Sequence, residues 1–165
     1  MAEPITERHP GTTRREVFKF AGTLAAAGAA AMVLVRPAAS TPAAMQAAID
    51  KVTGGVKVDV GKVKLDLPPL VENGNTVACS VSVDSPMTPA DYVKAIHIFN
   101  EKNPQPNVIS VRLGPRAGLA SIATRIRLSD TQKVIAIAEL SDGSFWSDNV
   151  DVIITLGACL EDNLI

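Results

Sequence analysis

The stretch Val77-Ala78-Cys79-Ser80-Val81-Ser82-Val83 alternates apolar and small polar side chains over seven residues. Successive side chains of a β-strand point to opposite faces, so the three valines and Cys79 would share one face. We expect that face to be buried, which makes Cys79 a small core hydrophobe. The preceding Asn73-Gly74-Asn75 is a turn signal. The pattern therefore predicts a β-strand with one face in a core.

Similar segments recur along the chain and are separated by turn residues. An alternating run extends from Val56 to Leu67 and ends at Pro68-Pro69. Further strands are expected over residues 91–100, 108–113, 122–128, 134–138 and 150–156. Residues 91–100 also resemble a helix start, because Thr88 precedes Asp91 by three positions, but their β-branched and aromatic content favours a strand. About seven short strands predict an all-β fold, an antiparallel sandwich of immunoglobulin-like form.

One helix is expected before the strands. Within residues 43–52, Met45, Ala48, Ile49 and Val52 recur at helical spacing, and Gly54-Gly55 follows. This spacing predicts a short amphipathic helix packed on the sandwich.

Residues 1–40 have the order of a twin-arginine (Tat) signal peptide. Thr13-Arg14-Arg15-Glu16-Val17-Phe18-Lys19 precedes an uncharged run rich in Ala and Gly, from Phe20 to Val35. A membrane anchor is the alternative, but the run is shorter than the roughly 20 residues of a spanning helix and only weakly hydrophobic. We therefore predict a leader cleaved near Ala38-Ala39-Ser40, export in the folded state, and a periplasmic location. Folded export favours a partner acquired before transport.

The domains expected from these features are the leader (1–40), the sandwich (41–156) and a tail (157–165).

Without the leader, the net charge is −3, which argues against a nucleic-acid-binding protein. The only histidine there, His97, excludes a metal site built on several imidazoles and is expected to be a hydrogen-bonded strand residue. No base, metal set or nucleophile constellation indicates an enzyme. Four arginines form either an anion-attracting patch or a solvated or partner-facing sheet surface: Arg112, Arg116, Arg125 and Arg127.

The tail carries a cysteine in Leu156-Gly157-Ala158-Cys159-Leu160, just past the last expected strand. Such a thiol is available to other proteins, as one inside a core strand is not. Gly157 and Ala158 are expected to be a flexible arm, and the chain from Gly157 to Cys159 has an extended reach of roughly 10 Å. In an oxidising compartment Cys159 and Cys79 could form a disulfide, although the inward position of Cys79 favours a core role.

Several segments together resemble the SoxY family, the sulfur-carrier subunits of periplasmic thiosulfate oxidation. They are Asn73-Gly74-Asn75-Thr76-Val77, Val81-Ser82-Val83-Asp84-Ser85-Pro86-Met87, Tyr92-Val93-Lys94, Phe99, Lys102-Asn103-Pro104-Gln105-Pro106 and Ile154-Thr155-Leu156-Gly157-Ala158-Cys159. The resemblance implies that Cys159 binds sulfur intermediates covalently, that no cofactor is needed beyond that transient sulfur group, and that a SoxZ-like subunit forms a heterodimer with this chain. It also implies three enzyme partners: a c-type cytochrome, a dimanganese hydrolase and a sulfane dehydrogenase.

The tail differs from the Gly-Gly-Cys-Gly-Gly ending of that family. Ala158 replaces a glycine, and Leu160 to Ile165 replace the final pair. Leu160 is bulky, while Glu161 and Asp162 are expected to repel dianionic thiosulfate and to disfavour the thiolate. Two functions follow: a sulfur carrier acting through Cys159, or a SoxY-like adaptor or binding protein without carrier activity.

Overall fold

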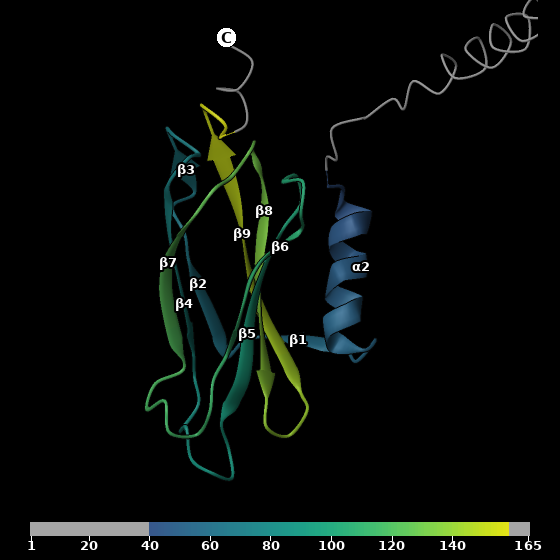
Figure 1. Cartoon of the computed structure of the whole chain (residues 1–165), viewed down its shortest axis with the longest axis vertical. Coiled ribbons are helices and arrows are strands. Elements are labelled where there is room, and N and C mark those ends of the chain that lie inside the picture. The colour runs from purple at the N-terminus through teal and green to yellow at the C-terminus, as the bar shows by residue number, and fades with distance from the viewer. Residues whose placement is uncertain (1–39, 159–165) are drawn as a thin grey trace, which may run out of the picture. The chain divides into compact units, whose positions relative to one another are not determined.

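The computed structural model describes residues 40–158, which form one helix and nine strands (Figure 1). The helix is α2 (Pro42–Thr53). The strands are β1 (Val58–Val60), β2 (Val63–Asp66), β3 (Leu70–Val71), β4 (Val77–Val83), β5 (Val93–Asn100), β6 (Asn107–Arg112), β7 (Ser121–Ile126), β8 (Gln132–Leu140) and β9 (Phe145–Ile154).

Two sheets pack face to face. The larger has the order β1-β9-β8-β5-β6, with β3 also paired to β9, and the smaller has the order β2-β4-β7. All pairings are antiparallel except those of β1 and β3, which lie parallel to β9. The expected immunoglobulin-like β-sandwich is confirmed, and the strand expected over residues 91–100 is present as β5.

The main core lies between the sheets. Val81 on β4 and Ile96 and Ile98 on β5 are at most 1% exposed and belong to this cluster. Cys79 belongs to it as well, on the inward face of β4, which confirms its expected position.

A second, smaller core joins α2 to the outer face of the larger sheet. Met45 and Ile49 of the helix pack with Phe99, Ile137 and Phe145, so α2 stands against that face in Figure 1. Thr41 caps the helix by accepting a hydrogen bond from the amide of Ala44 at 3.2 Å. Since β5 and β8 are covered by the other sheet on one face and by α2 on the other, their burial is nearly continuous.

Two segments differ from the sequence-based expectation. The run from Val56 to Leu67 splits into β1 and β2, which lie in different sheets, and the chain crosses between them at Gly61 (φ 118°). The last strand begins at Phe145, five residues earlier than predicted, and ends at Ile154, so Leu156 lies beyond it. The start of β9 shows no alternation because Phe145 belongs to the small core with α2, whereas the adjacent Trp146 packs against the main core.

Candidate functional site

The base of the C-terminal tail is packed into the end of the sandwich. The carbonyl of Leu156 accepts a hydrogen bond of 2.7 Å from the amide of Gly74, and the amide of Ala158 donates one of 3.1 Å to the carbonyl of Leu128. The amide of Leu128 donates in turn to the carbonyl of Gly74 at 2.9 Å. Three chain segments are thus joined by backbone hydrogen bonds at the point where the tail leaves the domain.

Two glycines allow this close approach. A Cβ atom on Gly157 would lie 1.9 Å from the carbonyl oxygen of Ser129, and one on Gly74 would lie 2.2 Å from the carbonyl oxygen of Leu128. Neither separation is compatible with van der Waals contact. Both positions therefore require glycine for space rather than for a left-handed backbone.

This arrangement bears on the predicted arm. Gly157 is buried and Ala158 is half-buried, so both are held by the domain body in this structure, a feature that the sequence did not indicate. Their flexibility during function stays a prediction. Cys159 itself lies outside the described residues, one position after the hydrogen-bonded amide of Ala158.

An exposed apolar surface lies beside the tail base. Leu70 on β3 and Ile153 on β9 are register partners and are 61% and 57% exposed, and Leu156 follows at 43%. Leu70 and Ile153 therefore form an exposed apolar pair close to the point where the tail leaves the domain.

Cys79 differs from the tail cysteine in its environment. It is a free thiol and is 2% exposed. Burial, with a smaller effect of the Asp66 carboxylate, raises the pKa of Cys79 to about 11. At neutral pH it is a protonated core residue and a poor nucleophile.

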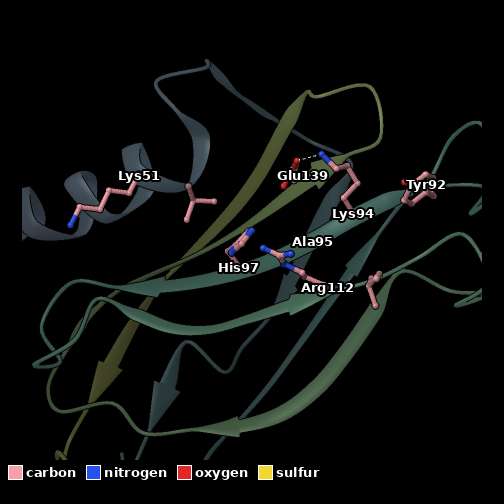
Figure 2. Close-up of a pocket in the computed structure, with 9 residues that line it drawn as sticks. Lys51, Tyr92, Lys94, Ala95, His97, Arg112 and Glu139 are labelled. Carbon is pink, nitrogen blue, oxygen red and sulfur yellow. Dashed lines mark hydrogen bonds and ion pairs between the residues drawn. The ribbon is translucent and has the colours of Figure 1, made fainter.

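A second polar feature lies on the outer face of the larger sheet, beside the end of α2 (Figure 2). It is a hollow of about 530 Å³, and its charged and polar lining residues are Lys51, Tyr92, Lys94, His97, Arg112 and Glu139. The expected hydrogen bond of His97 is present, between its Nδ1 atom and the hydroxyl of Ser110 at 2.8 Å. Burial lowers the pKa of His97; the Glu139 carboxylate opposes this shift and the Arg112 guanidinium adds to it.

The arginines singled out in the sequence do not form one patch. Arg112 ends β6 of the larger sheet and lines the hollow, whereas Arg125 lies on β7 of the smaller sheet. Within residues 40–158, no group of three or more His, Cys, Asp or Glu side chains is arranged to hold a metal ion. The same residues include no helix long and apolar enough to cross a membrane.

The domain resembles proteins of known structure. It matches the sulfur carrier protein SoxY from Chlorobium limicola f. thiosulfatophilum with a TM-score of 0.59 and 21% identity, covering 70% of this chain and 100% of that chain. It also matches superoxide reductase (neelaredoxin) from Ignicoccus hospitalis with a TM-score of 0.52 and 18% identity, covering 70% of this chain and 94% of that chain. At these identities the matches show a shared fold only.

The family comparison is more specific. No curated protein matched the chain. The family model described as "Sulfur oxidation protein SoxY" matches residues 49–159, from the middle of α2 to Cys159. This match spans about two thirds of the sequence, and the chain belongs to the SoxY family.

Proposed function

We propose that this protein is a sulfur carrier of thiosulfate oxidation that binds its cargo covalently through Cys159. The observation that carries the proposal is the geometry at the end of β9. Backbone hydrogen bonds hold the chain as far as Ala158, and the cysteine is the next residue. The family match ends at the same cysteine. The other thiol of the domain, Cys79, is buried and protonated, so it does not compete for cargo.

The family resemblance implies a reaction sequence of three steps on Cys159. The Cys159 thiolate and thiosulfate form a sulfur–sulfur bond, and the two electrons released pass to a c-type cytochrome. A dimanganese hydrolase then removes the terminal sulfonate with water, which leaves sulfate, two protons and a cysteine persulfide anion. A sulfane dehydrogenase then oxidises the outer sulfur of that persulfide and accepts the electrons released. In this scheme the protein is a substrate of its partners and not an enzyme.

The location and the assembly state belong to the same proposal. The twin-arginine motif at Arg14-Arg15 supports export to the periplasm in the folded state. A SoxZ-like subunit lacking a leader would travel with the folded chain as a heterodimer. The exposed apolar residues at the tail base, Leu70, Ile153 and Leu156, offer a surface on which a partner enzyme can rest while it receives the thiol.

The alternative is an adaptor without carrier activity, and the tail sequence favours it. Leu160 and the carboxylates of Glu161 and Asp162 follow the thiol directly. An adaptor would use the same apolar surface for protein binding, with Cys159 chemically idle.

Intact mass spectrometry separates the two functions. The protein is incubated with thiosulfate and the oxidising cytochrome, and the carrier proposal expects a mass gain of one thiosulfate group that is reversed by a reductant. Cys159→Ser abolishes the gain, and the matched variant Cys79→Ser retains it. An unchanged mass of the wild-type protein, with a cytochrome shown to load another carrier, would favour the adaptor.

A further inference from the structure

The hollow beside α2 gathers side chains from four elements. Lys51 comes from the helix, Lys94 and His97 from β5, Arg112 from β6 and Glu139 from β8. Figure 2 shows the His97 ring and the Arg112 side chain next to each other, with the Lys94–Glu139 ion pair above them in the view. The hollow is open to solvent on one side, and its volume of about 530 Å³ admits a small ion with its hydration water.

The charges in the hollow do not balance. Lys51, Lys94 and Arg112 are cationic, and Glu139 is the one acidic side chain in the lining. Glu139 pairs with Lys94, whereas neither Lys51 nor Arg112 takes part in an ion pair among residues 40–158. The lining therefore carries two uncompensated positive charges, one of them on a guanidinium whose planar fork matches the oxygens of an anion.

His97 provides an independent sign of a ligand. The residue is 9% exposed, and its Nδ1 atom is hydrogen-bonded to the Ser110 hydroxyl. Its Nε2 atom is buried and has no hydrogen-bond partner in the described part of the chain. Buried polar atoms are rarely left unpaired in folded proteins, and each exception calls for an explanation.

We propose that this hollow is a binding site for a small oxyanion of the sulfate type, held by Arg112 and Lys51 and by a hydrogen bond from Nε2 of His97. The excess positive charge selects a dianion over a neutral or cationic ligand. Tetrahedral oxygens can accept from a guanidinium, an ammonium and an imidazole at the same time. Because Nε2 is buried, binding requires the His97 side chain to turn so that this atom faces the hollow.

The hollow is separate from the end of β9, where the tail begins. His97 pairs with Ile137, which pairs with Ser147, and Ile154 lies seven residues further along β9. At about 3.3 Å per residue, this places the hollow roughly 23 Å from the end of that strand. Anion binding in the hollow therefore does not depend on covalent loading at Cys159, and it can be tested separately from the proposed carrier function.

Histidine-detected NMR tests the site on the full-length chain. The sequence contains two histidines, His9 and His97, and a His9→Gln variant assigns the signals. Sodium sulfate is titrated against sodium chloride at constant ionic strength. We expect the side-chain signals of His97 to shift along a saturating curve with sulfate and to stay in place with chloride.

Substitution of Arg112 then tests whether the sulfate binds in the hollow. Removing a charge-assisted hydrogen bond is expected to weaken the apparent affinity for sulfate about tenfold or more in Arg112→Gln. Arg125→Gln, which removes an exposed arginine from the other sheet, is the matched control and is expected to leave the curve unchanged. Absence of a saturating shift in the wild-type chain, or equal affinities of the Arg112→Gln and wild-type proteins, would overturn the proposal.

Discussion

The amide of Gly74 donates a hydrogen bond of 2.7 Å to the carbonyl of Leu156, although 82 positions separate the two residues in the sequence. The contact ties the turn before β4 to the chain just after β9. It gives the tail a fixed point of departure, because the chain is held by backbone hydrogen bonds as far as Ala158. A carrier whose thiol must enter several active sites benefits from a defined exit, because less conformational freedom is lost on each encounter.

Gly157→Ala is expected to destabilise the domain. The added methyl group would meet the carbonyl oxygen of Ser129 at 1.9 Å, and the nearest atoms all belong to the backbone of Ser129 and Asp130, so no flexible side chain can move away. Such overpacking typically costs about 1–3 kcal/mol. The free energy of unfolding is measured by urea denaturation. Gly114→Ala is the control, because a Cβ there meets nothing within 4 Å, and equal stabilities of the two variants would contradict the described packing.

Thiol labelling should distinguish the two cysteines. Burial holds the pKa of Cys79 at about 11, so at pH 7–8 the thiol is protonated as well as inaccessible. We expect a thiol reagent to modify one cysteine of the folded protein quickly and the second only after unfolding. Peptide mapping should identify the fast site as Cys159. Rapid modification of Cys79 in the folded state would show that β4 opens readily, contrary to its place in the core.

The carboxylates after the thiol should slow its reaction with anionic reagents. Replacing Glu161 and Asp162 by Gln and Asn removes two negative charges close to Cys159. In water, each carboxylate is expected to contribute on the order of 0.5 kcal/mol to the repulsion of an anion that approaches Cys159. Removing both should therefore raise the rate of alkylation by anionic iodoacetate severalfold. The rate with neutral iodoacetamide should rise less, and added salt should narrow the difference. Equal acceleration with both reagents would show that the carboxylates do not repel an incoming anion.

Stability should fall in mild acid through His97. Its pKa is lowered in the folded state, mainly by burial, so below the ordinary value of about 6.5 the unfolded chain takes up the proton first. Proton uptake by the unfolded state means that the free energy of unfolding decreases as the pH falls through this range.

His97→Gln keeps a polar side chain at this position and removes the titration. Denaturation curves at pH 7.5 and 5.0 should show a smaller loss of stability in the variant than in the wild-type protein. The nearby charges on Lys51, Lys94, Arg112 and Glu139 are unchanged in both. Identical losses would exclude His97 as a source of the pH dependence.

Most of the sandwich could be predicted from the sequence because its long strands have one buried face. Val77 to Val83 alternates in the sequence and in the structure. β3 could not be predicted, since a two-residue strand after Pro68-Pro69 has no period to detect. The early start of β9 could not be predicted because Phe145 and Trp146 are both apolar and pack in different cores, so the sequence shows no alternation there.

The sites were harder to predict because they depend on contacts between distant segments. The Asn73-Gly74-Asn75 turn was recognised, but nothing in its sequence ties it to Leu156. The hollow forms only when the register of β5 with β6 and β8 places Arg112 and Glu139 around residues 94–97. A sequence shows the residue types at such a site but not that they meet.

The position of β9 has a mechanical consequence. This strand is hydrogen-bonded to β8 on one side and to β1 and β3 on the other, and the tail continues from its end. A pull on the tail, as when a tightly bound active site releases the cysteine, would load β9 along its axis. The hydrogen bonds on both sides of β9 would then bear this force together, in shear, and would not break one after another. The domain is therefore built to withstand tension at the residue through which we propose it exchanges its cargo.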